Sequence, residues 1–416
     1  MLPLVNTTTH KLERYRGLLE KKALDEILKL AKPLKGLKVF HVNSTPRGGG
    51  VAEILNSLVP LMKGVGLNAA WHTIPPRNSF FEITKKMHNA LQGKDYNFSF
   101  AARKNYLAHL AKTAELMKDM KPDVWVIHDP QPAGVIMFLP DFNPAIARIH
   151  IDLSAPNREV WQFVSGFLEQ YDRVIFSSKD FAPQERIFRG KTVIFPPAID
   201  ALSVKNKIMP RPKAKEILKS FGVNPDRPLI AQVSRFDPWK DPLGVIEAYK
   251  IAKKKIPSLQ LALVGIFLAQ DDPEAKKIFS QCEKAVKNDP DLFLFAQKEL
   301  LGSLEVDEFV NIVQTAADVI LQKSIKEGFG ITVAEGMWKS KPVIGGRAGG
   351  IKLQIENGEN GYLVSSPGQA ASKIIYLLKN PDKGAALGDQ GRKTVSRNFL
   401  MPRLLSDYLK LLKQVV

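Results

Sequence analysis

Cysteine and histidine are scarce in this chain. Cys282 is the only cysteine among 416 residues, which excludes an internal disulfide and a cysteine-rich metal cluster. A single thiol fits a reducing compartment, so we expect a cytoplasmic protein. All seven histidines lie at or before His150, and no pair has the H-x-x-x-H spacing of a zinc site. We therefore expect no metal centre.

The chain also lacks long apolar runs. No segment approaches the ~18 consecutive apolar residues of a membrane span. Residues 1–17, MLPLVNTTTHKLERYRG, have no apolar core of the kind that signal peptides carry. We therefore expect neither a membrane protein nor an exported one. A length of 416 residues exceeds one ordinary hydrophobic core, which favours two domains.

Acidic residues are outnumbered by basic ones. There are 42 Asp and Glu against 60 Lys and Arg, which gives a net charge of +18. The excess is spread along the chain, and we find no basic stripe interleaved with aromatic residues, as nucleic-acid binding would require. Two interpretations stay open: a solvated, lysine-rich surface, or a field that attracts anionic substrates.

Short apolar segments alternate with helical patterns along most of the chain. This alternation predicts parallel sheets covered by helices on both faces. A Pro-rich segment at 195–213 indicates an interdomain linker. We therefore predict an α/β protein with two doubly wound domains that face each other across a cleft. Strands are expected at residues 37–42, 124–127, 145–150, 173–177, 229–234, 261–265, 292–295, 318–322 and 342–345, and an amphipathic helix is expected at 10–34.

The most informative segment is residues 326–336, KEGFGITVAEG, between an expected strand and an expected helix at 331–339. Its glycines let the backbone approach a ligand, and the free amides of a first helical turn face an anion such as phosphate. The carboxylates of Glu327 and Glu335 can accept hydrogen bonds from vicinal hydroxyls. Glu335 lies more than two turns further on, so it would reach another part of the same ligand. Together these groups indicate a sugar nucleotide.

A second loop, residues 234–240 (SRFDPWK), directly follows the strand expected at 229–234. It contains two cations, Arg235 and Lys240. Two fixed cations are what a departing diphosphate requires, because they stabilise the charge that develops as it leaves. Ordinary surface cations in a turn are the alternative.

Residues in the first half of the chain also follow expected strands. The sequence RGGG at 47–50 forms either a tight turn or a close passage of backbone past a phosphate or sugar. His150 ends a strand, where it is either structural or directed at a substrate. Asp129 and Gln131 follow another strand, and their side chains could hydrogen-bond a sugar.

These loops, in this order, resemble the large retaining GT-B glycosyltransferase family that includes sucrose and sucrose-phosphate synthases. The resemblance runs from the glycines at 48–50 to the terminal helix, which in that family returns to the first domain. It implies a first, acceptor-side Rossmann-like domain at 1–210 with a returning helix at 395–416. A second Rossmann-like domain at 211–394 would bind the nucleotide sugar. Ser234 departs from the pattern, since many members have glycine before the arginine.

Three strings are similar to one branch of this family, that of the trehalose synthases and trehalose phosphorylases, and above all to glucosyltransferring trehalose synthases of the archaeal type. The strings are VIHDPQP at 126–132, RIHID at 148–152 and FPPAID at 195–200. The resemblance implies a retaining enzyme that makes trehalose from NDP-glucose and free glucose, reversibly and by metal-independent front-face attack. It implies no resident cofactor, a donor such as UDP-, ADP- or GDP-glucose and a small sugar acceptor. It implies no nucleic acid and no membrane, and a homo-oligomer stays open.

The resemblance also implies roles for individual residues. Arg235 and Lys240 would neutralise the diphosphate, Glu327 would contact hydroxyls of the donor glucose, and Glu335 would hold the ribose. His150 would lie near the reacting sugar. The implied catalytic residues are Arg235, Lys240, Glu327 and His150, and the implied substrate-binding residues are Gly49, Gly50, Phe329, Gly330, Ile331, Thr332, Glu335, Asp129, Gln131 and Asp152.

Several other functions stay open at this stage. In a trehalose phosphorylase the same cations would bind inorganic phosphate, and a sucrose-type synthase would use another acceptor. A membrane-surface transferase would act on a lipid-linked acceptor and would need residues 10–34 as an exposed basic amphipathic helix. A non-catalytic nucleotide-sugar sensor would bind the donor without turnover.

Overall fold

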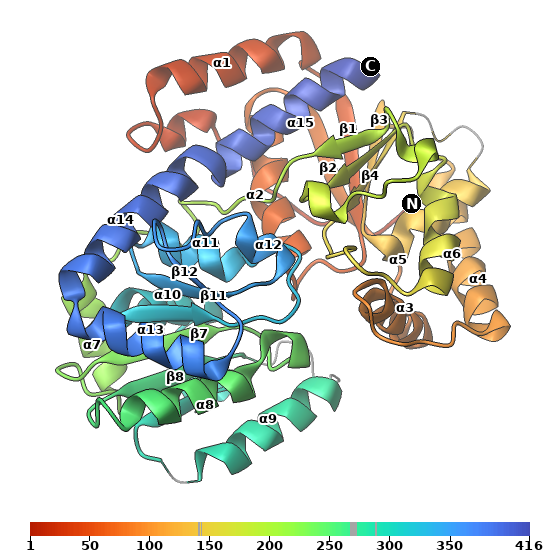
Figure 1. Cartoon of the computed structure of the whole chain (residues 1–416). Helices are drawn as coiled ribbons and strands as arrows, with labels where there is room; N and C mark the ends of the chain where they lie inside the picture. The colour runs from red at the N-terminus through yellow and green to blue at the C-terminus, as the bar shows by residue number, and fades with distance from the viewer. Residues whose placement is uncertain (140–141, 143, 267–272, 288) are drawn as a thin grey trace. The chain divides into compact units, whose positions relative to one another are not determined.

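The structure is a computed structural model that describes residues 1–139, 142, 144–266, 273–287 and 289–416 (Figure 1). The chain divides into two compact units. Unit 1 comprises Met1–Ala198 with Met401–Val416, and unit 2 comprises Ile199–Leu400. Each unit is built on a parallel six-stranded sheet, which confirms the predicted fold class of two doubly wound α/β domains.

Unit 1 has the strand order β2-β1-β3-β4-β5-β6. The order reverses direction between β1 and β3, and right-handed crossovers then place helices on both faces of the sheet. Ligands of such sheets bind beyond the carboxyl ends of the strands at this reversal. The strands are β1 (Lys38–Asn43), β2 (Asn68–Thr73), β3 (Val124–His128), β4 (Ala145–Ile149), β5 (Arg173–Phe176) and β6 (Thr192–Ile194). The helices of this unit are α1 (Lys21–Ala31), α2 (Gly50–Gly64), α3 (Asn78–Leu91), α4 (Phe100–Met117), α5 (Pro130–Ala133), α6 (Arg158–Leu168) and α15 (Met401–Val415).

Unit 2 has the strand order β12-β11-β10-β7-β8-β9, so its reversal lies between β7 and β10. Numbered within the unit this is the order 3-2-1-4-5-6 of dinucleotide-binding folds. Its strands are β7 (Leu229–Val233), β8 (Gln260–Val264), β9 (Leu292–Phe295), β10 (Val319–Gln322), β11 (Val343–Gly346) and β12 (Tyr362–Val364). Its helices are α7 (Arg211–Lys219), α8 (Pro242–Lys253), α9 (Pro273–Val286), α10 (Val306–Ala316), α11 (Ile331–Trp338), α12 (Gly349–Lys352), α13 (Pro367–Lys379) and α14 (Pro381–Asn398).

Several of the strands predicted from their apolar runs are completely buried. Every residue of β3, β4 and β8 is buried, as expected for the interior strands of a covered parallel sheet. Three strands escaped prediction: β2 has the mixed sequence NAAWHT, and β6 and β12 are three residues each. Short or mixed edge strands carry too little apolar pattern to be read from sequence.

The single helix predicted at 10–34 is wrong. A 3₁₀ turn at Leu12–Tyr15 (η1) ends before Gly17, whose φ of 84° lies in the left-handed region and interrupts any helix. The helix proper, α1, begins only at Lys21. Its residues Leu24 and Ile27 are buried, and α1 packs along α15 of the same unit (Figure 1). Its apolar face is therefore covered in part by protein, and Leu28 is 39% exposed.

The unit boundaries also differ from the predicted ones at 210/211 and 394/395. The segment after Ala198 belongs to unit 2, because Trp338 Nε1 donates to the carbonyl of Asn206 at 3.1 Å and Asn311 Nδ2 donates to the carbonyls of Val204 and Lys207, both at 2.9 Å. At the other crossing, α14 packs on α11, so the chain leaves unit 2 only at residue 400. Within the described residues, no helix is long and apolar enough to cross a membrane.

Candidate functional site

A cation and a carboxylate from neighbouring strand ends meet at the carboxyl edge of the unit 2 sheet. Lys240 ends a 3₁₀ turn, η6 (Pro238–Lys240), after β7, and Glu327 lies in the loop between β10 and α11. Lys240 Nζ is 2.5 Å from Glu327 Oε2, with side chains 18% and 11% exposed. Because β7 and β10 are paired neighbours, residues 87 positions apart come into contact. The two residues that the sequence assigned to one site are thus brought together.

The Glu327 carboxylate is also held by a neighbour that the sequence analysis did not name. Ser324 Oγ donates to Glu327 Oε2 at 3.1 Å, and Gln322 Nε2 donates to Ser324 Oγ at 2.9 Å. Both of these polar side chains are buried, Gln322 as the last residue of β10 and Ser324 two residues after it. A buried polar side chain at a strand end is the signal that could have found them.

The Lys240 backbone is tied to the sheet by the buried amide of Gln232. Gln232 Nε2 donates to the Lys240 carbonyl at 2.9 Å, and its Oε1 accepts from the Lys323 amide at 3.0 Å. Lys323 also forms an ion pair with Asp241, which adopts a left-handed φ of 49° and caps α8. This chain of contacts fixes the loop that carries Lys240, and the sequence analysis missed it.

Arg235 lies on the same loop but takes no part in the pair. Its side chain is 60% exposed, and its Nη2 donates to Asp237 Oδ2 at 3.0 Å. Asp237 also accepts from the amide of Trp239 at 2.8 Å. The sequence predicted two cations acting together, and the structure holds one against Glu327 and leaves the other exposed to solvent.

The start of α11 is shaped by glycines. Gly330 has a φ of 84°, which an L side chain rarely adopts. At Gly350 an added Cβ would stand 2.3 Å from Phe329 Cα, so only glycine allows the loop after β11 to approach here. Gln354 Nε2 donates to the carbonyls of Phe329 at 2.5 Å and Gly330 at 3.2 Å, which holds both segments together.

Around this helix start, backbone groups and not side chains are available to a ligand. The Phe329 ring is buried against Phe399, with ring centroids 5.4 Å apart. Thr332 Oγ1 donates to the carbonyl of Val233 at 3.0 Å. The amides of Ile331 and Thr332 belong to the first helical turn, where an α-helix provides no acceptor four residues back.

Glu335 is buried in unit 2, at a distance of eight residues along the chain from Glu327. Its side chain is 2% exposed, and its Oε2 accepts from Gln314 Nε2 of α10 at 2.8 Å. Its Oε1 lies 3.6 Å from Lys205 Nζ. The carboxylate therefore already has internal partners on the α10 side of α11, whereas Glu327 and the helix start open at the sheet edge. The assignment of Glu335 to the ribose stays a prediction.

The glycine loop of unit 1 joins β1 to α2. Gly48 has a φ of 85°, which explains one glycine. Gly49, the N-cap of α2, is extended at φ −165°, and a Cβ there would meet nothing within 4 Å. Gly50 opens the helix and is exposed, as Gly49 is. Neither the backbone conformation nor a neighbouring residue requires glycine at position 49. Close approach of a ligand to the backbone would explain the glycine there.

His150 is the outer end of a chain of three histidines. His41 Nδ1 lies 3.0 Å from His128 Nε2, and His128 Nδ1 lies 3.0 Å from His150 Nε2. The three come from β1, β3 and the end of β4, which are adjacent strands. Burial lowers the pKa of His41 to about 3 and holds the pKa values of His128 and His150 well below 6.5, and the charge of Arg148 lowers them further. The sequence analysis treated His150 as isolated, because only the strand order reveals its partners.

Asp129 lies beside this chain in a strained conformation. Its φ is 67°, unusual for a residue other than glycine. Its Oδ1 accepts from the His150 amide at 2.7 Å, and its own amide donates to the carbonyl of Arg148 at 2.8 Å. Burial raises the pKa of Asp129 to about 7, against the opposing effects of the His150 amide and the Arg148 charge. A strained carboxyl whose ionisation is disfavoured by burial fits a site that binds uncharged groups.

Gln131 and Asp152, the other two residues predicted in the first domain, differ in whether their side chains already have hydrogen-bond partners. Gln131 Oε1 is buried without a hydrogen-bond partner, so it could accept from a ligand. Asp152 is 2% exposed and its Oδ1 accepts from the Ser154 amide at 2.9 Å, so it is partly engaged in its own turn. Both follow strands that are neighbours in the sheet, β3 and β4.

No group of three or more His, Cys, Asp or Glu in the described part of the chain has the geometry of a metal site. The Asp289-Pro-Asp291 string, which resembles a metal motif, instead surrounds a lysine. Lys253 Nζ lies 2.7 Å from Asp289 Oδ1 and 2.9 Å from Asp291 Oδ2. A hydrogen bond from Arg227, and then one from Lys253, lowers the pKa of Asp291, and the bond from Lys253 lowers the pKa of Asp289 against the opposing effect of burial.

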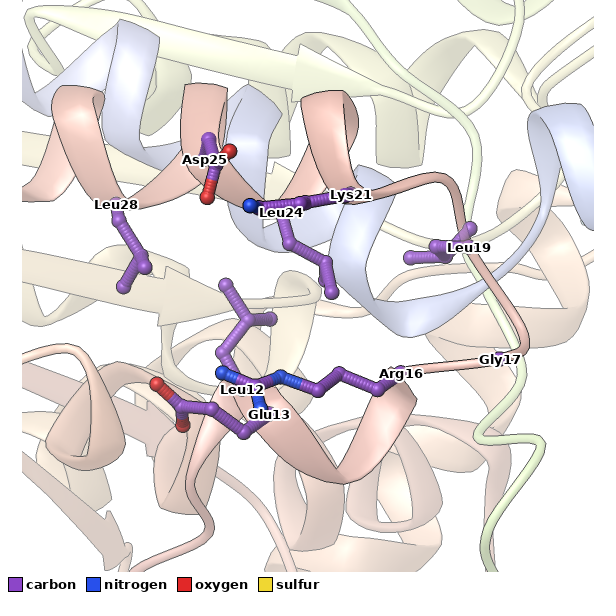
Figure 2. A pocket seen from close by; sticks show the side chains of 9 residues that line it. All are labelled: Leu12, Glu13, Arg16, Gly17, Leu19, Lys21, Leu24, Asp25 and Leu28. Atoms are coloured by element: carbon purple, nitrogen blue, oxygen red, sulfur yellow. The ribbon is translucent and has the colours of Figure 1, made fainter.

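A separate cavity of about 420 Å³ lies between η1 and α1 (Figure 2). Side chains from the two elements face one another across it, with leucines beside charged groups. The lining residues are Leu12, Glu13, Arg16, Gly17, Leu19, Lys21, Leu24, Asp25 and Leu28. None of the predicted site residues lines this cavity, so it is distinct from both sheet edges.

Comparison with protein-family models gives two matches. Residues 41–183 match the family described as "Trehalose synthase, N-terminal domain", and residues 213–394 match "Glycosyl transferases group 1". The chain is 43% identical over 406 residues to a trehalose synthase of Pyrococcus horikoshii, covering 97% of this chain and 96% of the relative. It is 41% identical to a trehalose synthase of Rubrobacter xylanophilus, with complete coverage of both.

More distant matches are of two kinds. A trehalose phosphorylase of Pleurotus pulmonarius is 30% identical over 88% of this chain, but this spans only 56% of that longer protein. Among solved structures, a sucrose-phosphate synthase from Thermosynechococcus elongatus superimposes with a TM-score of 0.69 at 19% identity, covering 91% of this chain and 98% of that one. A structure of Anabaena Alr3699/HepE with UDP and glucose gives a TM-score of 0.66 at 16% identity, covering 91% and 100%. The fold is GT-B.

Proposed function

Because this chain belongs to the trehalose synthase family of glycosyltransferases, we propose that it makes trehalose by transferring glucose from a nucleoside diphosphate glucose to free glucose. In this proposal the anomeric configuration of the donor is retained, and the reaction is reversible. Near-complete coverage of both chains by the trehalose synthases supports the assignment of the whole activity.

The observation that carries the proposal is the Lys240–Glu327 pair beside the start of α11. A half-buried ammonium group and the first amides of a helix attract the diphosphate. A carboxylate next to them accepts hydrogen bonds from sugar hydroxyls. In a nucleotide sugar the diphosphate is bonded directly to a ring that bears hydroxyl groups. One such ligand can therefore break the Lys240–Glu327 ion pair and replace it, with its diphosphate on Lys240 and its hydroxyls on Glu327.

In the proposed reaction the acceptor hydroxyl attacks the anomeric carbon on the face from which the diphosphate departs. The new bond joins the acceptor oxygen to that carbon, the bond from the carbon to the phosphate oxygen breaks, and the departing diphosphate takes the hydroxyl proton. Lys240 and the α11 amides stabilise the negative charge that develops on the diphosphate. Arg235 is exposed on the same loop and can swing to the same anion.

The neutral groups of unit 1 are proposed to bind the acceptor sugar. His150 and Gln131 follow adjacent strands and offer uncharged hydrogen-bonding atoms, and burial raises the pKa of the neighbouring Asp129 to about 7. Gly49 and Gly50 are exposed in the β1–α2 turn, and a Cβ at Gly49 would meet nothing within 4 Å. Free glucose carries no charge, so a site of this kind suits it better than a cluster of ions would.

Phosphorolysis of trehalose is the second candidate, favoured by the likeness to the fungal phosphorylase. In that reaction Lys240 and Arg235 would bind inorganic phosphate, and no nucleotide would be used. The two candidates therefore differ in one co-substrate.

An assay of both directions tests the proposal. UDP-, ADP- and GDP-glucose are each incubated with glucose, the disaccharide is identified by NMR, and trehalose is offered with either a nucleoside diphosphate or phosphate. We expect α,α-linked trehalose with at least one nucleotide sugar, and cleavage only with the matching nucleoside diphosphate. Cleavage with phosphate alone would establish the phosphorylase instead. Lys240→Met should abolish turnover, whereas Lys254→Met, at an exposed lysine that caps the far end of α8, should not.

A further inference from the structure

The three-histidine chain in unit 1 ends at a methionine. His41 Nε2, the ring nitrogen not used toward His128, lies 3.4 Å from the sulfur of Met62 on α2. At the other end His150 uses Nε2 toward His128, which leaves its Nδ1 for a ligand. The order of groups is therefore Met62, His41, His128 and His150, each within hydrogen-bonding distance of the next.

Proton counting allows two arrangements of this chain. A neutral imidazole carries one N–H and one bare nitrogen, so each contact needs a donor on one side and an acceptor on the other. In the first arrangement protons point from His41 toward His150, whose Nδ1 then carries a proton. In the second they point from His150 toward Met62, and Nδ1 of His150 is bare. Flipping one ring's tautomer alone would place two donors or two acceptors face to face.

The sulfur of Met62 distinguishes the two arrangements. A thioether accepts hydrogen bonds weakly and donates none. The first arrangement therefore sets a bare His41 nitrogen against the lone pairs of the sulfur, while the second gives that sulfur an N–H. Because His41 and Met62 are fully buried, such a mismatch costs free energy that solvent exposure would otherwise reduce.

We propose that Met62, through His41 and His128, holds His150 in the tautomer whose bare Nδ1 accepts a hydrogen bond from a hydroxyl of the bound sugar. Met62, His41 and His128 are then positioning residues, and His150 alone touches the substrate. This inference rests on the proposed function for the identity of the ligand, a neutral sugar hydroxyl.

The surroundings keep the chain neutral, as the proton count requires. Arg148 is buried beneath it, with its guanidinium carbon 4.9 Å from the centroid of the Phe195 ring and its Nη2 donating to the Phe195 carbonyl at 3.3 Å. A fixed positive charge disfavours a second one on any of the three rings. Asp129, the titratable carboxyl that contacts the His150 backbone, has its pKa raised to about 7 by burial, so near neutral pH it opposes this effect less than a fully ionised carboxylate would.

Histidine ring NMR tests the tautomer without any substrate. In protein labelled with ¹⁵N-histidine, a long-range ¹⁵N–¹H correlation spectrum shows which nitrogen of each ring carries the proton, and His150→Gln and His128→Gln identify the signals. We expect a bare Nδ1 and a protonated Nε2 at His150. A protonated Nδ1 would overturn the proposal.

The role of Met62 is tested by Met62→Leu, which keeps the size of the side chain but removes the acceptor. The matched control is Met87→Leu, another fully buried methionine of unit 1. Met62→Leu should give both His150 tautomers and lower kcat roughly 3- to 10-fold, the scale of one neutral hydrogen bond, while Met87→Leu changes neither. If the His150 tautomer is unchanged in Met62→Leu, the sulfur does not determine which tautomer forms. Since the spectra need no turnover, failure of the trehalose reaction itself would appear separately in the product assay.

Discussion

Unit 1 and unit 2 share a doubly wound parallel sheet but expose opposite chemistry at its carboxyl edge. In unit 2 that edge holds an ammonium group against a carboxylate, Lys240 and Glu327, with Arg235 exposed nearby. In unit 1 it holds neutral imidazoles and a carboxyl whose pKa is raised to about 7. In the proposed function the same backbone plan serves a charged ligand in one unit and an uncharged one in the other, because a few strand-end side chains decide what binds.

The largest expected effect comes from removing charge in unit 2. Glu327→Gln keeps the shape of the side chain but leaves Lys240 without its anion and the donor sugar without its acceptor. We expect kcat/KM to fall on the order of 10²- to 10³-fold, the scale seen when a preorganised electrostatic contact is removed. Steady-state kinetics with nucleotide sugar and glucose measure it. A fall of less than threefold would show that the pair is only a surface contact.

The glycine loops of the two units should respond differently to an added methyl group. Gly350→Ala in unit 2 brings Cβ against the backbone of Phe329, and we expect it to lower the free energy of unfolding by about 1–3 kcal/mol. Gly49→Ala in unit 1 meets nothing within 4 Å and should stay within about 0.5 kcal/mol of wild type. Urea unfolding compares them. Equal destabilisation would mean that unit 1 also uses its glycine for packing.

Acidification should weaken unit 1 through its histidines. The pKa of His41 is lowered from 6.5 to about 3 on folding, so the unfolded chain binds the extra proton over that window. Stability is therefore full above about pH 6.5 and falls as pH drops, by about 1.4 kcal/mol per pH unit for each such histidine. Asp129 contributes to stability with the opposite pH dependence, because its raised pKa favours the folded state as pH falls from about 7.

Hydrogen exchange in the unit 1 strands between about pH 7 and pH 5, corrected for intrinsic rates, measures this balance. Asp129→Asn removes the opposing contribution, so its loss of protection on acidification should be steeper than that of wild type. A shallower slope in Asp129→Asn would contradict the sign of the raised carboxyl pKa.

Much of the fold could be predicted from sequence, because interior parallel strands read as apolar runs. The pairing of Lys240 with Glu327 in unit 2 was predictable for the same reason. Both residues lie in loops that follow such strands, and parallel strands bring their carboxyl ends to one edge of the sheet. The histidine chain was not, since pairing His41 with His128 requires the strand order β1-β3-β4. Nor was the position of Glu335, whose partner Gln314 lies on another helix.

The most direct test of the contrast between a charged ligand site in unit 2 and a neutral one in unit 1 is calorimetric titration with the nucleoside diphosphate that supports turnover. If unit 2 alone binds the diphosphate, Lys240→Met should weaken its affinity roughly 10- to 100-fold, the scale of one charge-assisted hydrogen bond, and His150→Asn should leave it unchanged. Equal weakening by both variants, or none in Lys240→Met, would contradict the assignment of charged and neutral ligands to different units.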